Sequence, residues 1–309
     1  EKASRKVVRQ TVGEYLNGYI DRLLAEKRVG NAKTFQELRT SLTKFCRSLD
    51  FYFIDIDAEW LKRYEQWLRV ERHYSDNSIG IRFRSLRVLY NSAITDGLIK
   101  KTDYPFDTFK VSRFKEATAK RSLTKEDIRR IMDCEVRTLT KYPKPFLQLA
   151  KDLFLFSYLS CGITLTEILH IRYADIVDGR LVFNRQKTGK LLSFQLQPAA
   201  LYILDKYRQP NAHPQDYVFP VLRRSVHITA QQQYGRVQRT NKRINRYLKL
   251  IGEHLHLPIT LTTYVARHSF ATVLKRSGVS TSIISESLGH SSEKITQIYL
   301  DSFENSQID

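Results

Sequence analysis

The chain has 309 residues, and 51 lysines and arginines against 32 aspartates and glutamates give it a formal net charge of +19. Hydrophobic residues make up 42% of it, enough for a folded core, but its longest uncharged apolar run, residues 153–166, is shorter than the roughly 20 residues of a membrane helix. Cys46, Cys134 and Cys161 are odd in number and widely spaced, which fits neither a disulfide framework nor a zinc site. We therefore expect a cytoplasmic protein with no membrane segment, no metal and no other cofactor.

The positive charge is spread along the whole chain. Residues 1–120 hold 24 basic and 16 acidic side chains, and residues 121–309 hold 27 and 16. Such a distribution favours contact with a polyanion over the length of a folded protein, and nucleic acid is the leading candidate. A merely basic, soluble protein is the alternative.

Four short amphipathic helices are predicted in the first hundred residues. Capping-box patterns begin at Thr11 and at Thr34, Asp57 and Ser78 can cap the third and fourth helices, and Gly97 is placed near the end of the fourth. Apolar residues recur behind each start at helical spacing. The fourth helix also carries three basic residues that we expect to contact DNA: Arg82, Arg84 and Arg87.

The composition predicts two domains joined by a basic linker. Residues 1–109 form the helical domain, residues 110–121 a linker without clear periodicity, and residues 122–309 the second domain. Lys110 and Arg113 in the linker are candidate DNA contacts. The second domain should open with a helix capped by Thr124, bury an apolar helix at 146–160, and form a small antiparallel sheet from 175–177, 181–185 and 192–196. The predicted fold class is mainly α with one small sheet.

A later helix, from about residue 231, shows an arginine face. Its apolar residues, among them Val237 and Ile244, occupy the other side. Four arginines without interleaved acids favour contact with DNA phosphates, and a solvated surface stripe is the alternative. These arginines are Arg236, Arg239, Arg243 and Arg246.

The last fifty residues carry the most specific pattern. Arg267-His268 opens a helix, Leu288-Gly289-His290 follows, and Tyr299 stands nine residues after His290. In order and spacing this pattern resembles the tyrosine recombinases of the phage-integrase family. The form of residues 264–269 is most similar to integrases of mobile elements in Bacteroidetes.

The resemblance extends over residues 10 to 300. Residues 161–168 align with the first arginine motif of the family, Lys187 stands where the family has its catalytic lysine on a β-hairpin, and the N-terminal helices resemble the SAM-like core-DNA-binding domain. It implies that Tyr299 is the nucleophile, that Arg267 and His290 bind the scissile phosphate, that Lys187 is the general acid and that Glu167 supports the site. It also implies a reaction through a 3′-phosphotyrosyl intermediate without ATP or metal.

Two positions depart from the family pattern. Thr164 stands where most members have the first catalytic arginine, and Tyr264 replaces the usual histidine three residues before Arg267. Removing one donor to a transition state typically costs about 10²–10³ in rate, so the first change is the serious one. We expect another cation to take its place. The candidates are Arg172, Arg185 and Lys190.

The resemblance implies two domains that close around duplex DNA, with four protomers assembling on paired recombination sites and accessory DNA-bending proteins as further partners. The expected function is integration and excision of a mobile element on the bacterial nucleoid. A DNA invertase or resolvase of the same family remains an alternative, as do a topoisomerase-like relaxing enzyme and, because of Thr164, a catalytically weak DNA-binding protein. If the natural chain starts before Glu1, a further domain that binds arm-type DNA sites precedes it.

Overall fold

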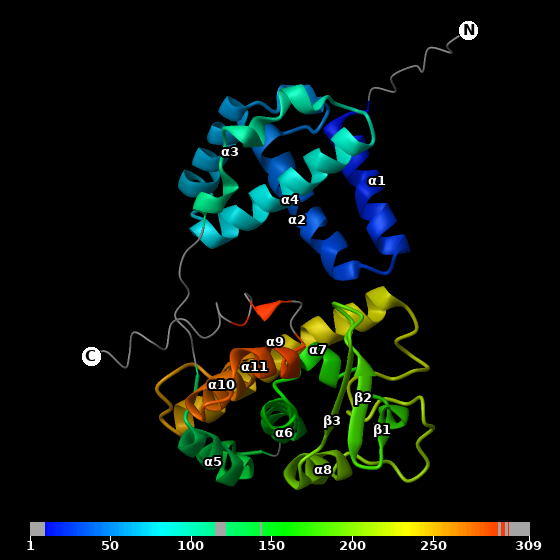
Figure 1. Ribbon diagram of the computed structural model, residues 1–309, viewed down its shortest axis with the longest axis vertical. Helices are drawn as coiled ribbons and strands as arrows, with labels where there is room; N and C mark the ends of the chain where they lie inside the picture. Colours follow the sequence, from blue (N-terminus) through cyan, green and yellow to red (C-terminus); the bar gives the residue numbers. More distant parts are fainter. Residues whose placement is uncertain (1–9, 115–121, 143, 290–291, 294–295, 297–309) are drawn as a thin grey trace. The chain divides into compact units, whose positions relative to one another are not determined.

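The computed structural model describes residues 10–114, 122–142, 144–289, 292–293 and 296, and the chain divides into two compact units (Figure 1). The first unit comprises residues 1–118 and the second residues 119–309. Each unit has its own apolar core.

Four helices and several single turns form the first unit. Its core contains Leu16, Leu38, Tyr64, Phe83 and Tyr90, which are almost fully buried, and aromatic rings pack against one another through its centre. The helices are α1 (Val12–Ala25), α2 (Val29–Cys46), α3 (Ala58–Val70) and α4 (Asp76–Thr95), with 3-10 turns at Phe53–Asp55, Lys101–Asp103, Pro105–Asp107 and Val111–Arg113.

Two of the predicted helix starts are confirmed and two are wrong. The hydroxyl of Thr11 accepts from a backbone N–H of α1, and the carboxylate of Asp57 accepts from one of α3, as predicted. Helix α2 begins five residues before Thr34, because the chain reverses directly after α1 and the Thr34 hydroxyl donates to the carbonyl of Gly30 within the helix. Helix α4 likewise begins at Asp76, with Ser75 as its N-cap instead of Ser78.

The segment predicted as a linker starts within the first unit. Val111 and Phe114 are buried in its core, and the ring of Phe114 stacks on Phe83 with centroids 5.3 Å apart. The basic residues of this segment led to its prediction as a linker, although its two apolar residues pack into the core of the first unit. Residues 115–121, the rest of the predicted linker, lie outside the described residues.

The second unit packs several helices around α6, with a small sheet at one side (Figure 1). The three strands form an antiparallel meander in the order β1-β2-β3, in which Leu181 pairs with Phe194. Its helices are α5 (Lys125–Asp133), α6 (Pro145–Leu159), α7 (Leu165–Ile168), α8 (Pro198–Asp205), α9 (Ala230–His254), α10 (Thr263–Arg276) and α11 (Thr281–Ser287). The strands are β1 (Ile176–Val177), β2 (Arg180–Asn184) and β3 (Leu191–Gln195), and 3-10 turns lie at Val136–Leu139 and Tyr173–Asp175.

Local sequence signals explain most of these elements. Thr124 and Asp127 form the predicted capping box of α5, and the turns at Gly179 and Gly189, both with positive φ, separate the strands. The predicted fold class, mainly α with one small antiparallel sheet, is confirmed. No helix in the described part of the chain is long and apolar enough to cross a membrane.

Candidate active site

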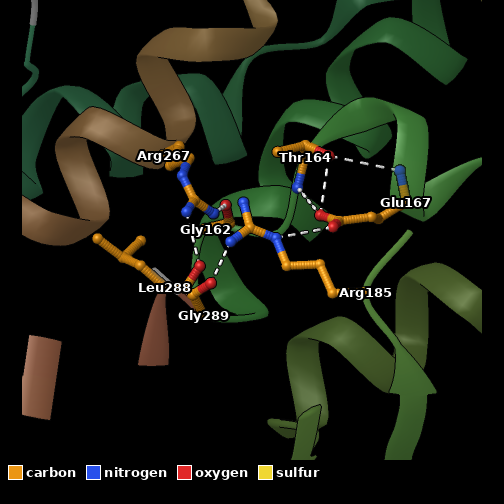
Figure 2. Close-up of polar contacts among 7 residues, drawn as sticks. All are labelled: Gly162, Thr164, Glu167, Arg185, Arg267, Leu288 and Gly289. Carbon is orange, nitrogen blue, oxygen red and sulfur yellow. Dashed lines mark hydrogen bonds and ion pairs between the residues drawn. The ribbon is translucent and has the colours of Figure 1, made fainter. Parts of the chain in front are cut away.

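Two arginine side chains from different elements meet in the interior of the second unit (Figure 2). Arg267 lies in the second turn of α10 and is 4% exposed, and Arg185 follows strand β2 and is 7% exposed. Buried arginines require hydrogen-bond partners, because an uncompensated buried charge is costly. The partners of these two therefore define the site.

Backbone carbonyls hold Arg267. Its Nη1 donates to the carbonyl of Gly162 at 2.7 Å, and its Nη2 donates to the carbonyl of Leu288 at 2.6 Å (Figure 2). Gly162 has a φ of +66°, and a Cβ there would lie 3.2 Å from Cγ of Arg267. The close approach of this turn to the arginine therefore depends on glycine.

Arg185 bridges a carboxylate and the same C-terminal turn. Its Nε donates to Oε1 of Glu167 at 3.0 Å, and its Nη1 donates to the carbonyl of Gly289 (Figure 2). Gly289 has a φ of +63°, and a Cβ there would lie 3.0 Å from Cδ1 of Leu192 on β3. The two arginines thus clamp the Leu288–Gly289 turn from two sides.

The start of helix α7 fixes the carboxylate that binds Arg185. Oε2 of Glu167 accepts from the backbone N–H of Thr164 at 3.2 Å and from its hydroxyl at 2.8 Å, and Glu167 is 6% exposed. Thr164 is the N-cap of α7 and forms a capping box with Glu167. Thr164 and Glu167, whose predicted role is to support the site, therefore belong to one hydrogen-bonded unit.

The charges of this cluster act on one another. Burial and the charge of Arg185 lower the pKa of Arg267 to about 10, while Glu167 opposes that shift. Arg267 remains protonated at neutral pH. Burial raises the pKa of Tyr264, and the positive charges of Arg267 and Arg185 oppose that shift. The cluster holds two buried guanidinium groups and one carboxylate, that of Glu167, which is bound to Arg185, so it carries excess positive charge suited to an anion.

Family comparisons agree with this geometry. The family model described as "Phage integrase SAM-like domain" matches residues 11–111, and that described as "Phage integrase family" matches residues 121–306. The chain belongs to the phage integrase family. Its enzyme class is that of the tyrosine recombinases, which exchange DNA strands.

Curated relatives carry the same class name. A tyrosine recombinase of Agathobacter rectalis is 24% identical over 298 residues, which cover 92% of this chain and 90% of that protein. The tyrosine recombinase XerC of Roseiflexus castenholzii is 24% identical over 289 residues, covering 90% of this chain and 86% of that protein.

Solved structures share the fold. The integrase of transposon Tn1549 in complex with transposon right end DNA has a TM-score of 0.64 at 17% identity, over 94% of each chain. A lambda integrase dimer bound to a COC′ core site has a TM-score of 0.60 at 17% identity, over 94% of this chain and 95% of that one.

The remaining predicted catalytic residues of this recombinase lie in different surroundings. Lys187 is exposed on the hairpin between β2 and β3, and within the described residues it makes no hydrogen bond or ion pair. Tyr264 is half exposed, and its ring meets that of His268 edge-on with centroids 4.7 Å apart. His290 and Tyr299 lie outside the described residues.

The structure separates the three candidates for the missing cation. Arg185 lies in the cluster with Glu167 and Arg267, as described above. Arg172 instead donates to Gln215 at 2.6 Å on an exposed surface. Lys190 is exposed next to the hairpin turn. Of the three, Arg185 is the one that the described contacts bring to Arg267.

The predicted DNA-contacting arginines of the first unit divide into two groups. Both Nη atoms of Arg82 donate to Oε2 of Glu37, and Arg113 forms an ion pair with Glu65. These two have acidic partners within the unit. The other predicted contacts of this unit are exposed: Arg84, Arg87 and Lys110.

The arginine face of α9 is present as predicted. Arg239 is exposed, and Arg236 is half-buried and donates through Nε to the carbonyl of Val221 at 3.1 Å. Arg243 lies 3.7 Å from the ring centroid of Phe146, and Arg246 lies 5.9 Å from that of Tyr247. The ring contacts orient these guanidinium groups while their N–H edges stay available.

Sequence reasoning missed the backbone acceptors of the site. The carbonyls of Gly162, Leu288 and Gly289 hold the two arginines. Every residue has a backbone carbonyl, so the pattern of side chains in the sequence does not indicate which carbonyls accept these hydrogen bonds. The glycines themselves were the available signal, because both adopt positive φ next to an arginine.

Proposed function

We propose that this recombinase cleaves DNA at specific sites with Tyr299 as its nucleophile, and that Arg267 and Arg185 together bind the scissile phosphate. One observation carries the proposal: two buried guanidinium groups lie near one another, and only that of Arg185 is paired with a carboxylate. A phosphodiester supplies the negative charge that this cluster lacks, and its charge increases in the transition state.

The guanidinium groups retain donors for such a phosphate. Each has five N–H bonds, and the described contacts use two on Arg267 and two on Arg185. The carbonyl and carboxylate contacts fix the guanidinium planes before DNA arrives, so the remaining N–H groups are already oriented. Preorganised donors of this kind stabilise a transition state without further reorganisation.

In this proposal Arg185 takes the role of the family's first arginine. Thr164 stands at that position in sequence, but the carboxylate three residues later recruits a guanidinium from the end of β2. The site therefore keeps two arginines, although only Arg267 stands at an arginine position of the family pattern. This arrangement favours an active enzyme over a protein that only binds DNA.

The chemical step follows the family's pattern at the matching positions. The Tyr299 hydroxyl loses its proton to water, its oxygen attacks the phosphorus, the bond to the 5′-oxygen breaks, and Lys187 gives a proton to that leaving oxygen. His290 donates to a non-bridging oxygen, and Tyr264 adds a hydroxyl donor. The product is a 3′-phosphotyrosyl bond with a free 5′-hydroxyl, and religation restores the phosphodiester without ATP or metal.

The biological reaction we propose is integration and excision of a mobile element on the bacterial nucleoid. The partner is duplex DNA with paired recombination sites, on which four protomers assemble with accessory DNA-bending proteins. Two domains that close around the duplex would account for basic surfaces on both units. The integrase of transposon Tn1549, solved in complex with transposon right end DNA, shares this fold.

Covalent trapping on a nicked attachment-site duplex tests the proposal. The wild-type chain should form a denaturant-resistant protein–DNA adduct, and Tyr299→Phe should abolish it. Tyr202→Phe is the matched control, because Tyr202 is an exposed tyrosine on α8, and it should trap DNA as the wild type does. DNA binding without any adduct would refute the enzyme and leave a DNA-binding protein.

Strand exchange separates the proposal from a relaxing topoisomerase. Two duplexes that carry the attachment sites should yield joined recombinant products. Relaxation of supercoiled DNA without recombinants would favour a topoisomerase-like reaction. Inversion between two sites on one molecule, without intermolecular products, would favour an invertase.

A further inference from the structure

A basic pocket lies in the first unit, whereas the two arginines of the active site belong to the second. It has a volume of about 230 Å³ and is enclosed by α2, the end of α3 and the beginning of α4. Four cations line it, Lys33, Lys44, Arg72 and Arg82, against one carboxylate, that of Glu37. Its charge is therefore strongly positive, and an anion is the ligand that fits it.

We propose that this pocket holds a phosphate group of the DNA backbone, an inference that rests on the proposed DNA-cleaving function. Lys33, Lys44 and Arg72 are exposed, and none of their side chains forms a hydrogen bond or ion pair with any other described residue. Three cations without a carboxylate partner at one pocket repel one another. A phosphate removes that repulsion and accepts hydrogen bonds from all three.

The inner wall of the pocket supports the same ligand. Arg82 is 13% exposed at its side chain, its Nη atoms are bound to Glu37, and its Nε is buried without a hydrogen-bond partner in the described part of the chain. A buried donor without a partner is costly unless a ligand or water accepts from it. Arg82 thus contributes positive charge from within, while the lysines and Arg72 contribute it at the rim.

Aromatic rings orient the two guanidinium groups of the pocket. Arg72 lies 5.8 Å from the ring centroid of Trp67, and Arg82 lies 5.9 Å from that of Tyr74. A ring contacts the face of a guanidinium and leaves its N–H edge free. The contact with Trp67 therefore leaves the N–H edge of Arg72 free to bind phosphate oxygens, whereas the Nη atoms of Arg82 are already bound to Glu37.

Binding of a phosphate here would fix the first unit on the duplex without reading its sequence. The inference revises the set of DNA contacts expected from the sequence, in which Arg82 was a direct contact. Arg82 is instead an inner support, and the exposed contacts are Lys33 and Lys44 on α2 and Arg72 after α3.

The test is the salt dependence of duplex binding by the full chain. Fluorescence anisotropy with a labelled 30-bp duplex (a length of about three helical turns) is measured from about 50 to 200 mM KCl. The logarithm of the association constant falls linearly with the logarithm of the salt concentration, and each lost phosphate contact makes this slope less steep by about 0.9. The double variant Lys44→Ala/Arg72→Ala should remove this one phosphate contact, reduce the steepness of the slope by up to about 0.9 and weaken binding by up to about 8-fold at 0.1 M salt.

A matched control removes the same charge from another face of the unit. Lys62→Ala/Arg63→Ala also deletes one lysine and one arginine, both exposed on α3 and outside the pocket lining. It should leave the slope close to that of the wild type. Glu37→Gln, which removes the competing carboxylate, should tighten binding and steepen the slope.

The outcomes separate this inference from the proposed function. If the wild type binds and traps DNA, but the pocket variant matches the Lys62→Ala/Arg63→Ala control, the pocket inference is overturned and the function stands. Its charge would then serve another acidic partner. If the wild type neither binds the duplex nor forms an adduct on the nicked attachment site, the function and the pocket inference both fail.

Discussion

Replacing Arg185 by glutamine should lower both cleavage and stability, for two separable reasons. If Arg185 is a transition-state donor, its loss lowers the cleavage rate by about 10²–10³. The same change leaves the Glu167 carboxylate, which is 6% exposed, without its arginine. Breaking a buried pair costs about 3–5 kcal/mol, and the two contacts that Thr164 still donates place this case near the lower value.

Second-site changes separate these effects. Adding Glu167→Gln to Arg185→Gln removes the unpaired buried charge, so the melting temperature should recover while cleavage stays low. Adding Thr164→Arg instead restores a guanidinium at the family's usual position, so cleavage should recover at least tenfold. Thr164→Arg alone should not raise the wild-type rate, because Arg185 already supplies the cation.

The assay is single-turnover cleavage of the nicked attachment-site duplex, with thermal melting on the same samples. At about 2–4 °C per kcal/mol for a unit of this size, a loss of about 3 kcal/mol lowers the melting temperature by about 6–12 °C. Arg172→Gln is the control, since Arg172 is exposed and bound to Gln215. Recovery of cleavage in Arg185→Gln/Glu167→Gln would refute the reasoning, because Arg185 would then act only as the partner of Glu167.

Two further substitutions test the packing of the catalytic unit. Gly289→Ala places a Cβ 3.0 Å from Cδ1 of Leu192 at a φ of +63°, and it should slow cleavage at least tenfold with unchanged duplex affinity. Gly278→Ala is the control, because its φ is +81° and a Cβ there meets no atom within 4 Å. This control bears only the backbone cost of about 1–2 kcal/mol. Equal cleavage rates for the two variants would contradict this. Asp152→Ala removes a carboxylate, 1% exposed, that accepts hydrogen bonds from a lysine, a tyrosine and a glutamine. It should lower the free energy of unfolding, measured in denaturant, by about 3–5 kcal/mol. The control Asp205→Ala, at an exposed aspartate, should lower it by less than about 1 kcal/mol. Similar unfolding midpoints would show that this network contributes nothing.

Local signals carried the fold because they are encoded within a few residues. The capping boxes at Thr11 and Thr124 require only a side chain and the amides that follow it, and both are present. The hairpin strands lie within one residue of their predicted limits, since turn residues fix the register. The start at Thr34 failed because the preceding turn at Lys27, with a φ of +59°, continues directly into α2, which no capping pattern records.

The site was predictable only in part, because its contacts join segments far apart in sequence. Motif spacing named Arg267 and Glu167, and it listed Arg185 as one of three candidates. The choice among those three needed the end of β2 to be placed beside helix α7, which depends on the packing of the whole unit. The carbonyl acceptors at Gly162 and Gly289 had no side chain from which to be inferred.

Thr164, which stands where most family members have an arginine, stabilises the start of α7 together with Glu167. An arginine at the N-cap of α7 would give the helix no side-chain acceptor, whereas the Thr164 hydroxyl accepts from the Glu167 N–H and contributes about 0.5–2 kcal/mol. The Glu167 carboxylate closes the capping box with one oxygen and binds Arg185 with the other. The interaction of a phosphate with a guanidinium depends on where the guanidinium lies in space, and not on which element of the chain carries it. In the proposed site, a cation that follows β2 therefore supplies the charge that an arginine at the start of α7 would supply, and α7 has a better cap, provided that Glu167 is retained.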